Sequence, residues 1–452
     1  MSTELIRKYN VPGPRYTSYP TVPFWKEELD LEEWKNRIKH TFDITNKAKG
    51  ISLYIHLPYC ESLCTYCGCT TRITINHAVE KPYIDTVLKE WNLYLSLFQE
   101  VPEIAEIHLG GGTPTFFSPD NLRRLIEGIK QTVVVRKDAE FGFEAHPNNT
   151  SSAHLHTLYD LGFRRVSFGI QDFDPVVQKI INRVQTYEQV KNVVDLAREI
   201  GYESINFDLI YGLPLQSASS IKDTFNKVQH LKPDRIAFYS YAHVPWVKPG
   251  QRMFTEEDLP SNEEKRNLYE LGKNLLTEIG YCEIGMDHFS LPDDALFQSA
   301  IKGKMHRNFM GYTTSHSQLS IGLGVSAIGD SWNAYGQNLK KVEEYKKVVE
   351  QRQFPIFKTH ILSKEELFIR RHITQLMCKF HTDWNPDEPG ARFLESGKDR
   401  LLEMKKDGLV VCTPNSIRVT DKGRAFVRNA CMSIDIHLWN KTEPRPKFSL
   451  TI

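Results

Sequence analysis

The stretch "ISLYIHLPYCESLCTYCGCTTR", residues 51–72, joins an apolar run to a loop that holds four of the chain's eight cysteines. Its first eight residues are rich in β-branched and large apolar side chains and end in proline, which is typical of a buried strand. Cys60, Cys64 and Cys67 follow in the spacing C-x3-C-x2-C, and Cys69 comes two residues later. The sequence therefore predicts a strand that delivers three thiols to one loop at its carboxyl end.

Five further runs with strand character follow, separated by amphipathic runs such as residues 81–98, 118–131 and 186–201 that predict helices. These strand candidates are EIHLGGG (106–112), EFGFEAHP (140–147), RRVSFGIQDF (164–173), SINFDLIYGLP (204–214) and RIAFYSYAHVP (235–245). Alternation of strand and helix predicts a parallel sheet with helices packed outside it. We expect an α/β fold, either an incomplete barrel or a strongly curved open sheet, with its chemistry at the carboxyl ends of the strands.

After residue 245 the alternation loosens. Residues 263–281 predict a helix, and residues 306–330 a glycine-rich, partly extended stretch. Residues 400–430 have the order helix, two-stranded ribbon, helix, as in a winged-helix module, which in other proteins can bind DNA. Lys and Arg number 57 against 56 Asp and Glu, so the net charge is only +1. This balance argues against a protein that coats nucleic acid or an acidic membrane, and favours a helical cap on the barrel.

The chain shows no segment that resembles a signal peptide and no apolar run long enough to cross a bilayer. Eight cysteines in 452 residues are too few for a disulfide scaffold. Their clustering instead indicates ligands in a reducing compartment, so we expect a cytoplasmic protein.

Thiolates are ligands for zinc, copper(I) and iron–sulfur clusters. A structural zinc site needs four ligands, which His56 or His77 would have to complete. Three cysteines on one loop fit a 4Fe-4S cluster with one iron left free, whereas electron-transfer clusters normally have four. Cys69 is a poor fourth ligand, because C-x-C in an extended segment points its thiols to opposite faces. The spacing favours the open cluster, with zinc binding and simple packing as alternatives.

The three-cysteine motif, with Tyr66 before its last cysteine, resembles the motif of the radical S-adenosylmethionine (SAM) superfamily. The GGGTP run at 110–114 resembles that superfamily's second signature. Further motifs are GPRYTSYPT (13–21), GIQDF (169–173), INFDLIYGLP (205–214), YAHVP (241–245), GMDHF (285–289), HRNFMGYTT (306–314) and GVSAIGD (324–330). Together they resemble one family, the oxygen-independent coproporphyrinogen III oxidases, over nearly the whole chain.

This resemblance implies an incomplete (β/α)6 TIM-like barrel of the radical SAM type. It implies an N-terminal arm over residues 1–48 that acts as a lid, a radical SAM catalytic domain over 49–340, and a mainly helical, winged-helix-like C-terminal domain over 341–452. The family converts two propionates of coproporphyrinogen III to vinyl groups, giving protoporphyrinogen IX, by means of a 5'-deoxyadenosyl radical.

In such an enzyme Cys60, Cys64 and Cys67 hold one 4Fe-4S cluster, and two SAM molecules bind beside it. By the resemblance, the first SAM contacts Tyr54, Gly111, Glu144 and Ile328, and the second contacts Tyr66, Gly112, Thr113, Gln171, Arg183, Asp208 and Ala242. From the residues alone, Glu144 and Asp208 also fit helix caps, Arg183 fits a surface ion pair and Tyr54 fits a core position. Cys69 is expected beside the site as a non-ligand.

The substrate carries four carboxylates, for which Arg15 and Arg307 are candidate partners. A flavodoxin or ferredoxin is the expected electron donor, and we expect a monomer with no nucleic-acid or membrane partner. The segment FEAHP differs from the family in having His146 at a position that is familiar as acidic.

Three rival readings remain. Heme-binding chaperones related to this family keep the three cysteines but usually lack Cys69 and the arm. A nucleic-acid-modifying radical enzyme would use the winged-helix-like tail for docking. A structural zinc protein would need a fourth ligand.

Overall fold

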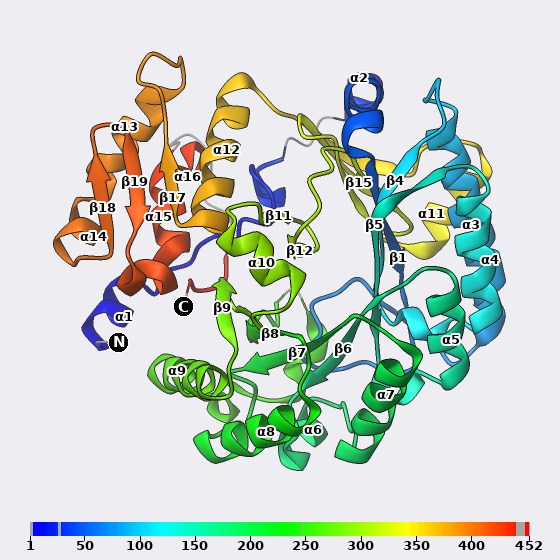
Figure 1. Ribbon diagram of the computed structural model, residues 1–452, viewed down its shortest axis with the longest axis horizontal. Coiled ribbons are helices and arrows are strands. Elements are labelled where there is room, and N and C mark those ends of the chain that lie inside the picture. The colour runs from blue at the N-terminus through cyan, green and yellow to red at the C-terminus, as the bar shows by residue number, and fades with distance from the viewer. Residues whose placement is uncertain (1–2, 26–28, 247, 440–447, 452) are drawn as a thin grey trace.

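Six parallel strands form the centre of the fold in the computed structural model, which describes residues 3–25, 29–246, 248–439 and 448–451. They are β1 (Ile51–Leu57), β4 (Glu103–Gly111), β5 (Val134–Ala145), β6 (Arg165–Gln171), β7 (Ser204–Tyr211) and β8 (Arg235–Ser240). Each pairs in parallel with the next in this order (Figure 1). The α/β prediction, with six parallel strands of the partial-barrel type, is confirmed.

The main sheet extends beyond these six strands at both edges. Next to β1 come the parallel β13 (Ser320–Leu323) and then the antiparallel β14 (Ile328–Asp330), β15 (Ala334–Asn338) and β16 (Ile356–Ile361). Next to β8 come the antiparallel β10 (His288–Ser290) and β9 (Cys282–Gly285), which completes a 12-stranded sheet. The sheet thus continues past residue 340, where the sequence places the end of the catalytic domain, and the domain limits stay a prediction.

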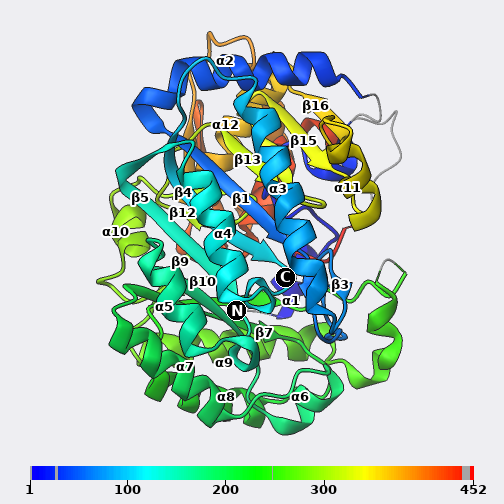
Figure 2. The same cartoon turned by 90° about the vertical axis from the view of Figure 1, so that its right-hand side faces the viewer.

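Helices cover the outer face of the curved sheet, as Figure 2 shows. They are α3 (Glu80–Leu95), α4 (Pro119–Lys130), α5 (Ser152–Asp160), α6 (Pro175–Ile180), α7 (Tyr187–Ile200), α8 (Ala218–Leu231) and α9 (Asn262–Glu278). The Ser118 hydroxyl accepts the Asn121 N–H and caps α4, while Gly201, at φ +106°, ends α7. Helix α4 therefore begins directly after Ser118 and α7 ends directly before Gly201, in agreement with the runs 118–131 and 186–201 that predict these helices.

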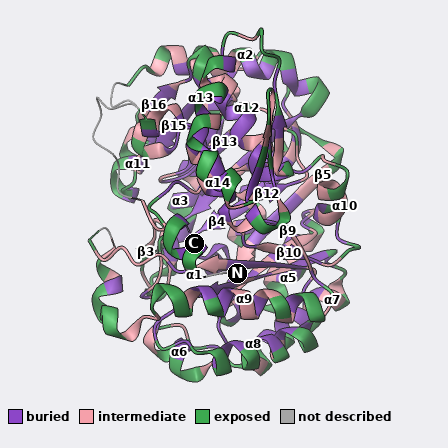
Figure 3. Cartoon of the chain, turned by 90° about the vertical axis from the view of Figure 1, so that its left-hand side faces the viewer, coloured by how far each residue is buried: buried purple, intermediate pink, exposed green. Residues whose placement is uncertain are grey.

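The two faces of each central strand differ in character, as β6 illustrates. Val166, Phe168 and Ile170 point outward into the large apolar core between sheet and helices. Ser167 and Gly169 alternate with them and face the inside of the curve, where they line a cavity. Figure 3 shows buried residues gathered in the interior, while the outer helices and turns carry much of the exposed surface. The outer face of the sheet is therefore apolar and packed against helices, whereas its inner face carries polar residues that line the cavity.

The C-terminal part forms a second, mainly helical unit. Its elements are α12 (Lys364–Lys379), β17 (His381–Asp383), α13 (Ala391–Arg400), α14 (Leu402–Lys406), β18 (Val410–Thr413), β19 (Ser416–Val419), α15 (Val427–Ile434) and α16 (Ile436–Trp439). The ribbon β18–β19 is joined by β17 in a three-stranded sheet. The N-terminal α1 (Thr3–Tyr9) packs here, where the Lys8 ammonium lies 2.7 Å from the Asp407 carboxylate.

The remaining elements lie between these units along the chain. They are α2 (Leu31–Lys49), β2 (Tyr59–Cys60), β3 (Arg72–Ile73), α10 (Ala295–Ile301), β11 (His306–Asn308), β12 (Gly311–Thr313) and α11 (Val342–Glu350). The region predicted to be an arm thus contains the long helix α2, whose Trp34 packs against β15. Within the described residues, no helix has the length and apolar character that crossing a bilayer requires.

Candidate functional site

The cysteine loop begins where β1 ends, and its two ends are fastened together. The short strands β2 and β3 pair in parallel. The Arg72 N–H donates to the Pro58 carbonyl at 2.8 Å, and the Thr74 N–H donates to the Cys60 carbonyl at 2.9 Å. The loop between them is therefore closed by backbone hydrogen bonds rather than left free.

Two neighbouring segments hold the loop from its sides. The Thr65 N–H donates to the Ile181 carbonyl at 3.0 Å, and the Gly112 N–H, just past the end of β4, donates to the Leu57 carbonyl at 2.8 Å. A Cβ at Gly112 would lie 2.5 Å from the Pro58 oxygen, closer than atoms can approach. Glycine at position 112 therefore allows two backbone segments to approach each other beneath the cysteines.

Four thiols of the loop lie on the wall of one cavity of about 640 Å³ at the carboxyl ends of the strands. The Cys60 sulfur lies 3.3 Å from the Thr113 hydroxyl, and the Arg183 Nη1 donates to the Cys64 sulfur at 3.6 Å. A hydrogen bond from the Cys69 thiol lowers the pKa of Cys67 to about 6 and raises that of Cys69. Burial raises the pKa of Cys60 to about 11.

This donor set fits an iron–sulfur cluster better than a single ion. Three thiols from one loop share a cavity wall with a cation and with glycine backbone, which leaves room for a bulky anionic group. Among the described residues, no group of three or more His, Cys, Asp or Glu side chains is arranged to hold one metal ion. The two histidines that could complete a zinc site have other partners, His56 the Thr70 carbonyl at 2.8 Å and His77 the Glu80 carboxylate at 2.6 Å.

Most of the residues predicted to bind SAM lie on the wall of the same cavity. They are Tyr66, Gly111, Gly112, Thr113, Glu144, Gln171, Arg183 and Asp208, and Cys69 lines it as well. Tyr66 and Cys69 come from the cysteine loop, and the others come from β4, β5, β6 and β7 or from the segments that follow β4 and β6. Residues far apart in the sequence thus converge because parallel strands share one carboxyl edge.

Three of the predicted SAM contacts, Tyr54, Ala242 and Ile328, do not line this cavity. The Tyr54 hydroxyl lies 3.0 Å from His56 Nδ1, and its ring stacks at 6.2 Å on His108, which lines the cavity. The Ala242 carbonyl accepts from Gln251, whose amide also donates to the Tyr66 carbonyl. Ile328 begins β14, two strands from β1. The structure does not place these three side chains on the cavity wall.

Two carboxylates line the cavity from β5 and β7, the strands on either side of β6. Glu144 accepts the Gly111 N–H at 3.2 Å. Asp208 accepts the Ser167 hydroxyl at 2.9 Å and the Asn206 amide at 3.0 Å. Burial, and then the nearby charge of Glu144, raises the pKa of Asp208 to about 6. Both groups can accept hydrogen bonds from hydroxyls of a bound ligand, and neither is the helix cap that its local sequence allows.

The two candidate substrate cations also lie just behind the wall. Arg15 donates to Asp287 at 2.7 Å and lies over the ring of Tyr239. Arg307 is buried over the ring of Tyr312 at 4.5 Å, and its Nε and Nη1 have no hydrogen-bond partner among the described residues. Tyr239 and Tyr312 both line the cavity, so each arginine backs an aromatic residue of its wall.

Sequence reasoning missed several polar and aromatic lining residues. They are His108, Ser167, Asn206, Tyr239, His288 and Met310. Ser167 and Asn206 lie two positions before Gly169 and Asp208 and so on the same face of their strands, which made strand alternation an available signal. His288 lies in the GMDHF motif, but the sequence did not indicate it as a site residue. Its Nδ1 donates to the Met286 carbonyl at 2.7 Å, and burial lowers its pKa to about 4, so it is neutral.

His146, the position that departs from the family pattern, is also a lining residue. Its Nδ1 accepts the Asn148 N–H at 3.1 Å. Burial, and then the charge of Arg183, lowers the pKa of His146 to about 3. A neutral imidazole here avoids adding charge next to the cysteine loop.

Comparison with known proteins gives consistent results. The profile of the Radical SAM superfamily matches residues 54–228. The oxygen-independent coproporphyrinogen III oxidase of Helicobacter pylori strain J99 is 38% identical over 96% of both chains. That of Escherichia coli K12 is 36% identical over 97% of this chain and 95% of its own. The solved structure of the Escherichia coli coproporphyrinogen III oxidase, described as a radical SAM enzyme, superimposes with a TM-score of 0.90 at 34% identity, covering 97% of this chain and 99% of that one.

Proposed function

The chain belongs to the family of oxygen-independent coproporphyrinogen III oxidases, and from this membership we propose the reaction that it catalyses. It is a radical SAM oxidoreductase of heme biosynthesis that removes carbon dioxide from two propionates of coproporphyrinogen III without oxygen. The product is protoporphyrinogen IX, in which these two side chains are vinyl groups. The observation that supports this most strongly is the three-thiol loop that opens into a polar cavity large enough for small-molecule ligands.

A radical SAM enzyme uses one 4Fe-4S cluster and SAM. Together these groups supply a one-electron cleavage that yields a radical able to abstract hydrogen from carbon. We assign the cluster to Cys60, Cys64 and Cys67, and exclude Cys69 because a fourth thiolate would occupy the iron that SAM needs. Cys69 instead donates its thiol hydrogen bond to Cys67.

Two SAM molecules per chain are part of the proposal. Glycine backbone at Gly111 and Gly112 allows close approach of a ligand, and Glu144 and Asp208 accept hydroxyl hydrogens. Arg183 lines the cavity and has two N–H groups beyond those that contact Gly169 and Cys64, which suit an amino-acid carboxylate. Tyr54, Ala242 and Ile328 act from behind the wall in this arrangement.

The substrate brings four carboxylates to a cavity whose rear contains buried cations. Arg307 supports a propionate contact, because two of its N–H groups are buried without a partner among the described residues. Arg15 is already paired with Asp287, so a propionate would have to share or replace that contact. The arm that carries Arg15 then acts as the predicted lid.

The remaining partners follow from the chemistry. The cluster needs an external one-electron donor, for which a flavodoxin or ferredoxin is the proposed class. All eight cysteines are free thiols, which supports the cytoplasm as the location. We propose a monomer that binds neither nucleic acid nor membrane.

An anaerobic assay of the reconstituted protein tests the function. With SAM, a reductant and coproporphyrinogen III, the wild type should release carbon dioxide and form protoporphyrinogen. Cys64→Ser should abolish both products, whereas Cys412→Ser, on the distant β18, should retain them. Heme transfer without any decarboxylation would instead identify a heme chaperone.

A further inference from the structure

Arg183 has an unusual set of partners for a cation at the wall of a cavity. Its Nε and Nη2 donate to the same backbone oxygen, that of Gly169, at 3.2 and 2.6 Å. Its Nη1 donates to the sulfur of Cys64 at 3.6 Å. Among the described residues, no carboxylate forms an ion pair with this guanidinium. The side-chain partner of this guanidinium is therefore the sulfur of Cys64.

The local backbone fixes this position of the guanidinium. Gly169 faces the inside of the sheet on β6, and a Cβ there would lie 2.7 Å from Arg183 Nη2. The Gln185 amide donates to the Gly169 and Ile170 carbonyls at 3.2 and 2.7 Å, which holds the same stretch of strand from its other side. The guanidinium is thus held at the Gly169 carbonyl on β6, and a side chain at position 169 would displace it.

We propose that Arg183 donates a hydrogen bond to the sulfur of Cys64 in the loaded enzyme and thereby raises the reduction potential of the cluster. Reduction adds one negative charge to the cluster, and a fixed cation with an N–H directed at a ligand sulfur stabilises that charge. This inference rests on the proposed function, since it requires Cys64 to be a cluster ligand. Arg183 is here a positioning and tuning residue.

The guanidinium has five N–H groups, and its contacts to Gly169 and Cys64 use three of them. Two remain for the carboxylate of a ligand in the cavity. One side chain thereby joins the ligand sulfur of the cluster to the site proposed for the second SAM. A carboxylate bound there would partly neutralise the cation and lower the potential again.

A redox titration without SAM isolates the effect on the cluster from any effect on ligand binding. The electron paramagnetic resonance (EPR) signal of the reduced cluster is measured against potential under anaerobic conditions. Arg183→Gln should shift the midpoint to a more negative value. Gly169→Ala should shift it in the same direction although the charge is retained, because the added methyl displaces the guanidinium. Arg183→Lys keeps the charge but not the guanidinium, so its midpoint potential should lie between those of the wild type and Arg183→Gln.

Lys248→Gln is the matched control, because Lys248 donates to the Cys69 carbonyl at 3.1 Å and not to a sulfur. Its shift should be smaller than that of Arg183→Gln. Equal midpoints for Arg183→Gln, Gly169→Ala and wild type, at equal iron and sulfide content, would overturn the inference, as would an equal shift in Lys248→Gln. If the Arg183→Gln protein takes up no cluster, the midpoint potential of Gly169→Ala alone decides whether the inference holds. A wild type that takes up no cluster contradicts the proposed function itself.

Discussion

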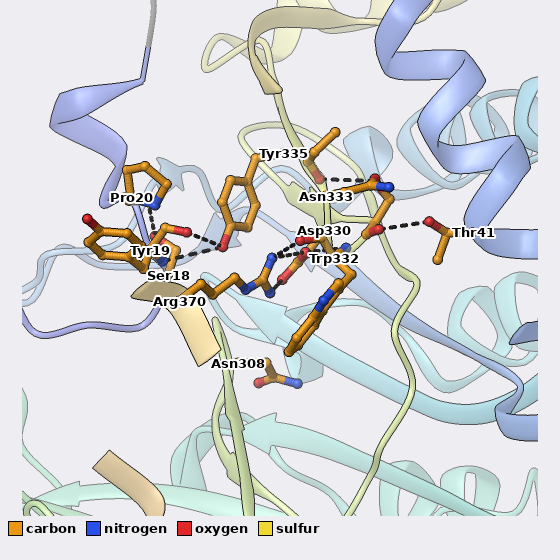
Figure 4. A network of polar contacts seen from close by, with 12 residues as sticks. Ser18, Tyr19, Pro20, Thr41, Asn308, Asp330, Trp332, Asn333, Tyr335 and Arg370 are labelled. Atoms are coloured by element: carbon orange, nitrogen blue, oxygen red, sulfur yellow. Dashed lines mark hydrogen bonds and ion pairs between the residues drawn. The ribbon is translucent and has the colours of Figure 1, made fainter. Parts of the chain in front are cut away.

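Arg370 on α12 and Asp330 on β14 form a buried, two-pronged ion pair that joins the C-terminal unit to the main sheet. The guanidinium Nη1 and Nη2 lie 3.1 and 2.5 Å from the two carboxylate oxygens, and Nη1 also donates to the Trp332 carbonyl. Figure 4 shows the same guanidinium beside Tyr335, whose hydroxyl donates to the Tyr19 carbonyl at 3.1 Å. Three distant parts of the chain, including the N-terminal arm, therefore meet at one network.

Breaking this pair should destabilise the fold strongly. Asp330→Asn leaves the guanidinium buried without its countercharge, so the free energy of unfolding should fall by about 3–5 kcal/mol. Denaturant unfolding followed by circular dichroism measures it. The control is Arg371→Gln on the same helix, where the exposed pair with Glu388 should contribute at most about 1 kcal/mol. Equal losses in the two variants would show that the buried pair has no special role.

A methyl group at Gly112 should disable the site without unfolding the protein. Its Cβ would lie 2.5 Å from the Pro58 oxygen and 3.0 Å from the Cys60 sulfur, so the cysteine loop must move. A displacement of about 1 Å in a catalytic arrangement can lower the rate about 100-fold. We expect a loss of this size for Gly112→Ala in the decarboxylation assay. Gly68→Ala, in the same loop with nothing within 4 Å of its Cβ, should retain nearly full activity.

Glu90 should make stability depend on pH. It is fully buried and accepts hydrogen bonds from the Gly324 N–H, the Tyr345 hydroxyl and the Asn338 amide. Burial is the largest influence on its pKa, which rises from 4.5 to about 7 despite these bonds. Between these two values the folded protein binds more protons at Glu90 than the unfolded chain does. Its contribution to stability is therefore complete below pH 4.5 and is lost as pH rises toward 7, by roughly 3 kcal/mol.

Glu90→Gln removes this titration and should flatten the profile of unfolding free energy between pH 5 and about 8. The exposed Glu127→Gln on α4 should leave the profile as in the wild type. The measurement is denaturant unfolding at several pH values. Parallel profiles for wild type and Glu90→Gln would contradict the assignment.

Cys69 should prove dispensable for holding the cluster. Cys69→Ser should keep the iron and acid-labile sulfide content of the wild type after anaerobic reconstitution, since only the hydrogen bond to Cys67 is changed. Cys67→Ser should lose most of both elements. Loss of iron in Cys69→Ser to the level of Cys67→Ser would make Cys69 a ligand and close the free iron position.

Local sequence patterns were sufficient to predict the six parallel strands at the centre of the fold. Each of the six parallel strands carries its own apolar residues and ends at a glycine, proline or polar turn, and each pairs with the next of the six along the chain. The cysteine spacing and the GGGTP run are likewise local. Eight of the eleven SAM contacts that the family resemblance implies lie on the cavity wall, because the carboxyl ends of parallel strands share one edge.

The missed features depend on pairing between distant segments. β13 pairs with β1 although Ser320 and Ser52 are far apart in the sequence, and no local pattern indicates such a partner. The buried pair of Arg370 and Asp330 is equally invisible, because each residue alone resembles a surface charge. Ile328, which the resemblance implies as a SAM contact, begins β14 and does not line the cavity, so its role stays a prediction.

The most direct test of the central claim is EPR spectroscopy of the anaerobically reduced protein before and after SAM is added. If Cys60, Cys64 and Cys67 leave one iron free in this cavity, SAM should change the spectrum of the reduced cluster. A spectrum that SAM leaves unchanged, on protein with full iron and sulfide content, would contradict the account.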